Sequence, residues 1–373
     1  MKIVADDKIP FLRGALEPFA EVIYVPGKAI TKEIIRDADA LLIRTRTKCT
    51  PELLQGSAVR FIGTATIGFD HLNTNYCEEN DIKWTNAPGC NSSSVQQYIT
   101  AALLKLSRDH NFPLKGKVLG IVGVGNVGTK VEKAARALGM EVMLNDPPRE
   151  RKEGKGNFVL LGDILYNADI ITVHVPLNFV GEDATWHMFN EKSFKKMRKG
   201  TWFINAARGE VVDTASIRKA ISGDKIRAVL DVWENEPDID NTLMHQAFLA
   251  TPHIAGYSTD GKANGTAMSV NALCSFFGLP IDSWYPKDVP PPPDPVIIID
   301  GKGMEDYDII RQAVNRTYSI EHDDIRLRLS PRDFEKQRGD YRLRREFTAY
   351  SVKLKNAGTD VRKILRDLGF NLV

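Results

Sequence analysis

A short apolar run followed at once by a glycine-rich hexapeptide constrains the fold of this chain more than any other feature. Residues 118–122 (VLGIV) have the composition of a buried parallel strand, residues 123–128 (GVGNVG) follow them, and a helical pattern comes next. In such a unit Gly123 permits the tight turn, Gly125 lets the backbone approach a pyrophosphate, and Gly128 lets helix and strand pack closely. The pattern predicts the first strand and helix of a doubly wound, dinucleotide-binding sheet.

The acid that follows the next strand indicates which dinucleotide is bound. Residues 141–145 are typical of a strand, and Asp146 stands 18 residues after Gly128. At this spacing a carboxylate can accept hydrogen bonds from the hydroxyls of the adenosine ribose. Because Asp146 would repel a 2′-phosphate, the sequence favours NAD over NADP. The alternative is that Asp146 only forms a turn before Pro147.

Composition excludes several other classes of protein. A chain of 373 residues can hold two or three domains, and 43% hydrophobic with 26% charged residues is ordinary for a globular protein. The net charge of +2 gives no reason to expect a nucleic-acid or membrane partner, and no run of about 18 apolar residues occurs. The four cysteines form no CxxC pair and the seven histidines no HExxH motif, so no metal is expected. These features predict a cytoplasmic enzyme.

The pattern of strands and helices predicts an α/β fold. The N-terminal quarter alternates short strands with helical connections, and the central part repeats this alternation around a doubly wound parallel sheet. The prolines of residues 290–295 exclude helix and central strand, and therefore predict an extended linker. The expected strands are residues 2–5, 40–43, 61–63, 118–122, 141–145, 170–173, 201–204, 227–230 and 296–300, and the expected helices of the C-terminal part are residues 306–315 and 359–368.

Three polar side chains follow successive central strands. Arg208 comes after the strand of residues 201–204, Glu236 lies beyond the next strand, and His253 stands in the loop after that. Because the carboxyl ends of parallel strands share one edge of the sheet, these side chains should gather where the cofactor binds. An arginine can hold a substrate carboxylate in a bidentate manner.

Histidine and glutamate complete the set needed to oxidise an alcohol beside a carboxylate. His253 would accept the hydroxyl proton while the hydrogen on C2 leaves as hydride to the nicotinamide. Glu236 would orient the ring and favour its charged form. Each residue alone is more often structural, as a satisfied loop histidine, a solvated glutamate or a surface arginine. Together and in this order they favour catalysis.

These motifs resemble those of the D-isomer-specific 2-hydroxyacid dehydrogenases over residues 1 to about 285. The resemblance rests on the glycine-rich turn and on residues 173–177 (VHVPL), 206–209 (AARG), 236–237 and 253–256 (HIAG). It implies two similar α/β domains, with the substrate domain interrupted by the nucleotide domain. The implied boundaries are a substrate domain over residues 1–94 completed by about 258–285, an NAD-binding domain over 95–257, a proline linker over 286–295 and a C-terminal dimerisation domain over 296–373.

The resemblance also assigns roles to particular residues. Arg208 would bind and polarise the substrate, Glu236 would partner the histidine, and His253 would be the acid and base. The positions that it places around NAD, together with the glycine-rich turn, are Gly123, Gly125, Asn126, Val127, Gly128, Asp146, Val175, Ala206, Ala207, Arg208, Asp231 and Gly256. The positions that it implies for substrate contact are Thr45, Thr66 and Tyr257, and for each threonine the alternative is local turn capping.

The C-terminal tail is rich in arginine. Arg326 with Arg328, and Arg342 with Arg344, alternate as the residues of strands do. The resemblance implies that this tail forms a homodimer, and we hypothesise that Arg342, Arg344 or Arg345 crosses the dimer to meet a substrate phosphate. The atypical loop around Thr66 and this tail favour a family member that acts on a phosphorylated 2-hydroxy acid.

Two other functions stay open at this point. Another member of the family, acting on 3-phosphoglycerate or hydroxypyruvate, would share the chemistry but should carry a different C-terminal addition. In an NAD-sensing corepressor on the same fold, the dehydrogenase site would be secondary to partner binding. The sequence lacks the long disordered tails that the second function would need.

Overall fold

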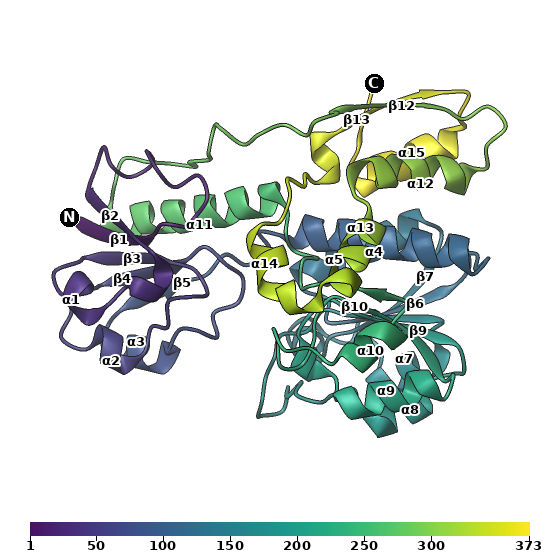
Figure 1. Cartoon of the computed structure of the whole chain (residues 1–373), viewed down its shortest axis with the longest axis horizontal. Helices are drawn as coiled ribbons and strands as arrows, with labels where there is room; N and C mark the ends of the chain where they lie inside the picture. Colours follow the sequence, from purple (N-terminus) through teal and green to yellow (C-terminus); the bar gives the residue numbers. More distant parts are fainter. The chain divides into compact units, whose positions relative to one another are not determined.

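The structure is a computed structural model that describes residues 1–373. The chain divides into two compact units (Figure 1). Unit 1 consists of Met1–Asn91 and Tyr257–Pro291, and unit 2 consists of Ser92–Gly256 and Pro292–Val373. The chain therefore passes between the units at each end of the central stretch and again at the start of the C-terminal part.

Unit 1 is built on a five-stranded parallel sheet with the order β2-β1-β3-β4-β5. Its strands are β1 (Lys2–Asp6), β2 (Glu21–Val25), β3 (Ala40–Ile43), β4 (Phe61–Thr64) and β5 (Lys83–Thr85). The three inner strands are those that the sequence predicted. The two edge strands were missed because their side chains are mostly half-buried and lack a continuous apolar run.

Alternating side chains of this sheet face two cores. Val4, Leu41 and Ile62 belong to one core, whereas Ile3, Leu42 and Phe61 belong to the other. The second core also contains Val270, Leu273 and Cys274 of the long helix α11, which thus covers that face. The helices of unit 1 are α1 (Lys32–Ile35), α2 (Pro51–Leu54), α3 (Thr74–Glu79) and α11 (Thr259–Phe277), with one 3₁₀ turn, η1 (Gly27–Ala29).

Unit 2 contains a six-stranded parallel sheet with the order β11-β10-β9-β8-β6-β7. Its strands are β6 (Val118–Val122), β7 (Glu141–Asn145), β8 (Ile170–Val173), β9 (Thr201–Asn205), β10 (Ile226–Leu230) and β11 (Leu249–Ala250). Five of the six were predicted, and the two-residue edge strand β11 was not. The order reverses between β6 and β8, so ligands are expected beyond the carboxyl ends of the strands at this point.

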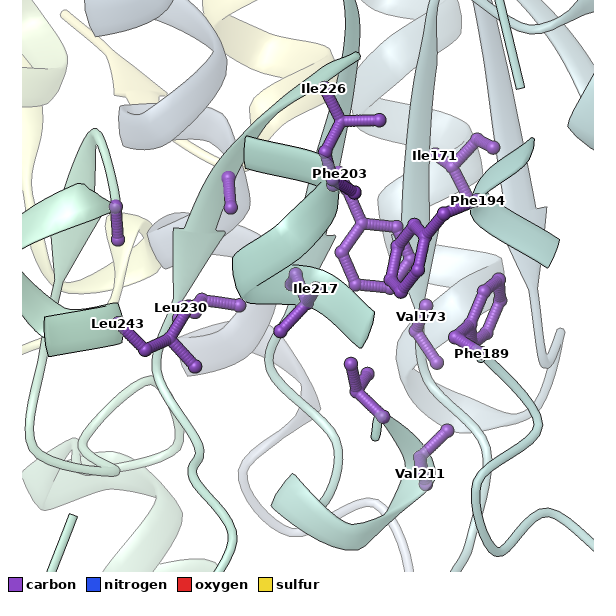
Figure 2. Close-up of a cluster of buried hydrophobic side chains, with 14 of the residues drawn as sticks. Ile171, Val173, Phe189, Phe194, Phe203, Val211, Ile217, Ile226, Leu230 and Leu243 are labelled. Atoms are coloured by element: carbon purple, nitrogen blue, oxygen red, sulfur yellow. The ribbon is translucent and has the colours of Figure 1, made fainter. Parts of the chain in front are cut away.

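Helices cover both faces of this sheet, with α4 and α5 on one side and α7 to α10 on the other (Figure 1). Figure 2 shows Phe189, Phe194 and Phe203 meeting in the core under α8 and α9. The ring of Phe203 lies with its centroid 4.9 Å from that of Phe189 and 5.5 Å from that of Phe194. The helices and 3₁₀ turn are α4 (Ser92–Asp109), α5 (Asn126–Ala137), α6 (Pro147–Glu153), α7 (Leu161–Asn167), α8 (Glu191–Lys196), η2 (Gly209–Val211), α9 (Thr214–Ser222) and α10 (Asn241–Gln246).

The C-terminal part of unit 2 has its own parallel sheet with the order β12-β13-β14. Ile297 and Ile299 of β12 are buried, while Val296 and Ile298 are exposed on the opposite face. The predicted strand and both predicted helices are present. The elements are β12 (Val296–Asp300), α12 (Asp306–Thr317), α13 (Ile320–Leu329), η3 (Pro331–Asp333), α14 (Phe334–Gly339), η4 (Phe347–Ala349), β13 (Ser351–Lys355), α15 (Thr359–Leu368) and β14 (Asn371–Leu372).

The arginine alternation in the tail does not mark strands. Arg326 and Arg328 lie on helix α13, where Arg328 pairs with Asp324 one turn earlier at 2.9 Å. Arg342 and Arg344 lie in an irregular segment between α14 and η4. Each pair of arginines spans only three positions, which is too short to distinguish a strand from a helix. The i,i+4 pair with Asp324 stabilises the helical conformation around Arg328 instead.

Candidate active site

The predicted catalytic and cofactor residues of unit 2 gather at one edge of its sheet. Because all six strands run parallel, the loops that follow them leave from the same edge. Each of these loops carries a predicted residue: Gly123 follows β6, Asp146 follows β7, Val175 follows β8, Arg208 follows β9, Asp231 follows β10 and His253 follows β11.

The glycine-rich turn has the geometry of an anion site. Gly123 adopts φ +89°, and a Cβ on Gly128 would lie 2.1 Å from the carbonyl oxygen of Gly123, so both positions need glycine. A Cβ on Gly125 would have no neighbour within 4 Å, which leaves the approach to the turn open. Helix α5 starts with Asn126 and Val127, and no side chain caps it. Its first N–H groups and the positive end of its dipole therefore suit a pyrophosphate.

Asp146 is held beside this turn. Its Oδ2 accepts a hydrogen bond from the backbone N–H of Val124 at 2.8 Å, and its Oδ1 accepts one from Arg149 N at 3.0 Å, which caps α6. Both of the functions that the sequence left open are thus compatible with its position. The carboxylate lies directly after β7 and against the glycine-rich turn.

His253 and Glu236 form a hydrogen-bonded pair. The Nδ1 of His253 lies 2.7 Å from Oε2 of Glu236, and Oε1 of Glu236 accepts a hydrogen bond from Trp233 N at 3.0 Å. Burial alone would raise the pKa of Glu236, but the charge and hydrogen bond of His253, helped by the charge of Arg338, hold this pKa below its usual value. A carboxylate can only accept, so His253 donates through Nδ1 and its Nε2 remains for another partner.

Asp231 holds the loop of residues 251–256, called here the His253 loop. Its carboxylate is buried and accepts hydrogen bonds from Thr251 Oγ1 at 2.6 Å, Ile254 N at 2.8 Å and Ala255 N at 2.9 Å. Burial raises the pKa of Asp231 although these bonds oppose it. The side chain of Asp231 therefore fixes Ile254 and Ala255, the two residues before Gly256.

The Arg208 loop is fixed by its neighbours. Asn205 donates from Nδ2 to the carbonyl of Arg208 at 2.9 Å and accepts from Ala207 N at 3.1 Å, while Arg208 Nη1 donates to the carbonyl of Ala207 at 2.8 Å. A Cβ on Gly209 would lie 2.0 Å from the backbone of Trp233. The loops that carry Arg208 and Glu236 therefore pack against each other through a glycine. Ala206 lies half-buried directly after β9.

The residues predicted to contact substrate belong to unit 1. Thr66 Oγ1 donates to the carbonyl of Gly68 at 2.9 Å and lies 2.8 Å from Thr64 Oγ1. These bonds agree with the alternative that Thr66 caps its own turn. Thr45 is exposed in the loop after β3. Tyr257 is the first residue of the second segment of unit 1, and the ammonium of Lys262 lies 5.5 Å from the centre of its ring.

The hypothesis that Arg344 reaches a substrate phosphate is wrong. Arg344 is 2% exposed, and its guanidinium donates hydrogen bonds to acceptors within unit 2. Arg342 pairs with Asp323 at 3.4 Å. For Arg342 and Arg345 the hypothesis stays a prediction. Sequence reasoning also missed Thr251 and Trp233, which fix the His253 loop. Both residues lie next to the motifs, but their hydrogen bonds, from Trp233 Nε1 to the carbonyl of Thr251 at 3.0 Å and from Thr251 Oγ1 to Asp231 at 2.6 Å, depend on the packing of separate loops.

One further cluster could hold a metal ion. His187, Asp213 and Glu234 offer one ligand atom each within 4.8 Å of one another. However, Glu234 accepts hydrogen bonds from His187 Nε2 at 2.6 Å and from Thr214 N at 2.8 Å, and Asp213 accepts one from Ser216 N at 2.7 Å. The two carboxylates thus anchor the start of α9, and we treat the cluster as structural.

Family comparisons agree with this geometry. Residues 94–255 match the model of the D-isomer specific 2-hydroxyacid dehydrogenase, NAD binding domain, and residues 291–369 match a domain of unknown function. The chain is also 49% identical to a curated relative that it covers almost completely. The chain belongs to the D-isomer specific 2-hydroxyacid dehydrogenases.

Three curated relatives of this family that resemble the chain carry the same name. The erythronate-4-phosphate dehydrogenase of Bacteroides fragilis is 49% identical over 94% of this chain and 99% of its own length. Those of Porphyromonas gingivalis and Proteus mirabilis are 44% and 39% identical, over 99% and 100% of this chain and 100% and 99% of their own lengths. The resemblance inferred from the motifs is confirmed, and it extends through the C-terminal domain.

Solved structures confirm the predicted α/β fold class. The NAD⁺-bound 3-phosphoglycerate dehydrogenase of Entamoeba histolytica superposes with a TM-score of 0.63 at 25% identity, covering 74% of this chain and 95% of its own. The D-lactate dehydrogenase of Aquifex aeolicus, complexed with NAD and lactic acid, gives 0.61 at 25% identity over 78% and 100%. The chain is an NAD-binding oxidoreductase, and its substrate is a small hydroxy acid, as in its family.

No helix of the chain combines the length and the apolar character that crossing a bilayer requires.

Proposed function

We propose that the chain oxidises 4-phospho-D-erythronate at C2 to 2-oxo-3-hydroxy-4-phosphobutanoate with NAD, a step in the biosynthesis of pyridoxal 5′-phosphate. The observation that carries the chemistry is the 2.7 Å contact between His253 and Glu236, at the same edge of the sheet as a turn suited to a dinucleotide. The substrate is supported by the shared name of relatives that match the chain along nearly its full length.

His253 is the proposed base. Nδ1 donates to the Glu236 carboxylate, so Nε2 of the neutral ring can accept the proton of the C2 hydroxyl. The ring then carries a positive charge, which the ionised Glu236 stabilises across the 2.7 Å contact. NAD, when bound, supplies the acceptor for the hydride that leaves C2. In the reverse direction the charged ring returns the proton to the carbonyl oxygen.

Arg208 is the proposed carboxylate ligand. Its guanidinium stands at the carboxyl end of β9, and the bonds of Asn205 fix the backbone that carries it. A guanidinium can bind the substrate carboxylate with two parallel hydrogen bonds and draw charge from the oxygen on C2. This contact orients C2 so that the hydroxyl faces His253.

The residues proposed to hold NAD lie in the loops at the carboxyl ends of the strands of the six-stranded sheet. The pyrophosphate would bind at Gly125, Asn126 and Val127, where the helix start is uncapped and a side chain is absent. Asp146 would accept the ribose hydroxyls. The backbone around Val175, Ala206, Ala207 and Gly256, and the apolar side chains among these, would line the nicotinamide half.

Positive charge in unit 1 supports a phosphorylated substrate. Lys262 lies beside Tyr257, and burial together with the charge of Arg44 lowers the pKa of the Lys262 ammonium. Arg44 donates to the carbonyl of Lys8 at 3.0 Å, a neutral partner that leaves its charge uncompensated. We place Thr45, Thr66 and Tyr257 among the substrate contacts on the strength of the family resemblance, and a phosphate would offset the charge nearby.

The C-terminal domain is the proposed homodimer interface. It exposes large apolar side chains in the C-terminal sheet and on α13, including Ile298, Ile325 and Leu329, which are 61%, 51% and 78% exposed. Such residues are costly to leave in water and are typical of an interface. Sedimentation of the wild-type chain and of an Ile325→Glu, Leu329→Glu double variant tests this: a dimer that becomes a monomer supports it, and a wild-type monomer refutes it.

A substrate panel tests the proposed reaction. Purified protein is assayed with NAD and 4-phospho-D-erythronate, 3-phospho-D-glycerate or D-glycerate, and NADH formation is followed. We expect kcat/KM to be highest for 4-phospho-D-erythronate. A preference for 3-phosphoglycerate or glycerate would replace the proposal by one of the alternative dehydrogenases, and NAD binding without turnover of any substrate would favour the corepressor alternative.

A further inference from the structure

One arginine of the C-terminal domain, Arg344, is buried against the His253 loop. Arg344 donates from Nη1 to the carbonyls of Ile254 at 3.2 Å and Ala255 at 3.4 Å. Its Nη2 donates to the carbonyl of Ser94 at 2.7 Å, and its Nε donates to Gln97 Oε1 at 2.8 Å. The guanidinium also lies 3.8 Å from the centre of the Tyr318 ring. The side chain of Arg344 is thus 2% exposed, and these contacts hold its charge in the interior of unit 2.

Two side chains of opposite charge bind the backbone of the same two residues, one at their N–H groups and the other at their carbonyl groups. Asp231 accepts the N–H groups of Ile254 and Ala255, and Arg344 binds the carbonyl groups of those two residues. Hydrogen bonds to charged groups are roughly twice as strong as those between neutral groups.

A second contact from the same domain supports the strand before the loop. Asp324 Oδ1 accepts a hydrogen bond from Ala250 N at 2.7 Å, and Arg328 donates to the carbonyls of Met244 and Ala247 at 2.9 and 2.8 Å. Strand β11 has two residues and pairs only with β10. Such a short edge strand has little hydrogen bonding of its own to hold the His253 loop in place.

We propose that the C-terminal domain positions the His253 loop for catalysis, with Arg344 as the main positioning residue. His253 itself adopts φ +54°, a left-handed conformation that is uncommon for residues other than glycine. The two residues after it, Ile254 and Ala255, are held by Asp231 at their N–H groups and by Arg344 at their carbonyls. Ser94 Oγ also donates to the carbonyl of Ala255, at 2.8 Å. The kinetic part of this inference rests on the proposed function, whereas the structural part does not.

Hydrogen exchange of the full-length protein tests the structural part without any substrate. Arg344→Met removes the donors and keeps the apolar stem, Arg344→Lys keeps the charge with fewer donors, and Arg362→Met is the matched control. Arg362 is also a C-terminal arginine, but it donates to the carbonyl of Leu354 within its own domain. We expect the amides of Ile254 and Ala255 to exchange at least about tenfold faster in Arg344→Met, less so in Arg344→Lys, and at the wild-type rate in Arg362→Met.

Steady-state kinetics then separate positioning from plain stability. At a temperature where each variant is folded by circular dichroism, Arg344→Met should lower kcat at least about tenfold with little change in the substrate KM, and Arg344→Lys should recover part of it. The pH at which kcat is half-maximal should also shift. Equal kcat and pH profile in wild type and Arg344→Met, or unchanged exchange at Ile254 and Ala255, would overturn the proposal. If Arg344→Met does not fold, Arg344→Lys carries the same comparison.

The two proposals fail in different ways. If the wild-type protein does not oxidise 4-phospho-D-erythronate, the proposed substrate is wrong, but faster exchange in Arg344→Met still supports the positioning role. If the wild-type protein is active and the exchange of the His253 loop does not depend on Arg344, only the positioning role is wrong.

Discussion

Replacing Glu236 by glutamine tests the pairing on which the proposed chemistry depends. The carboxylate accepts two hydrogen bonds, from His253 Nδ1 at 2.7 Å and from Trp233 N at 3.0 Å. An amide has one acceptor oxygen, so one of these donors loses its partner. If the oxygen stays on His253, the change from a charged to a neutral acceptor costs about 1 to 2 kcal/mol of stabilisation of the charged ring.

The other orientation of the amide is more damaging. If the NH₂ group faces His253, Nδ1 must accept, the proton moves to Nε2, and the ring cannot take the substrate proton. General base catalysis contributes about 10² to 10⁴ in rate, so we expect kcat of Glu236→Gln to fall at least about 10²-fold. The folded protein should still bind NADH, as measured by fluorescence titration.

The pH profile gives a second reading of the same variant. Oxidation needs neutral His253, so wild-type kcat should rise with pH to a plateau. In Glu236→Gln the dependence of kcat on pH should differ from that of the wild type, because no carboxylate stabilises the charged ring. Glu234→Gln is the matched control, since Glu234 lies in the same loop and bonds His187 at 2.6 Å. We expect kcat of this control within about threefold of wild type. If Glu236→Gln kept wild-type kcat and pH profile, the reasoning would be refuted.

Three further predictions concern other residues. Asp146→Ser should raise the ratio of kcat/KM with NADP to that with NAD at least about tenfold, because the negative charge that repels a 2′-phosphate is gone; an unchanged ratio contradicts its place at the ribose. Arg208→Lys should raise KM and lower kcat, together at least about 10²-fold in kcat/KM, because an ammonium cannot form the bidentate contact; substrate kinetics near wild type would exclude this contact. Burial lowers the pKa of His174 to about 3, so below about pH 6.5 the unfolded chain binds a proton that the folded chain does not, and stability falls as the pH is lowered. The acid-side loss should be smaller in His174→Gln by up to about 1.4 kcal/mol per pH unit, measured by urea unfolding, and equal slopes would contradict it.

The sequence predicted those parts of the fold that depend on short-range patterns. The apolar run 118–122 and the glycines after it place the cofactor turn, because strand burial and the need for glycine are local properties. Arg208, Glu236 and His253 could be placed at one edge because parallel strands must end together. The edge strands β2, β5 and β11 were missed because pairing with a neighbour, and not their own pattern, makes them strands.

Contacts between distant segments were beyond the sequence pattern. The arginine at position 344 looks like any residue of a basic tail, yet it is buried against carbonyls about 90 residues earlier in the chain, in the His253 loop. Nothing in its local sequence distinguishes it from Arg342, which pairs with Asp323. The buried Asp231 was predicted as a cofactor residue, and only the three-dimensional arrangement shows that its carboxylate binds the loop.

The most direct test of the account is to follow the hydrogen on C2. Purified protein is incubated with NAD and 4-phospho-D-erythronate deuterated at C2, and the products are examined by NMR and mass spectrometry. Hydride transfer from C2 should give one deuterium in the reduced nicotinamide for each 2-oxo acid formed, and this transfer should be lost in His253→Ala. Deuterium released to water, or no reduced nicotinamide from the wild-type protein, would contradict hydride transfer from C2 as the reaction of this site.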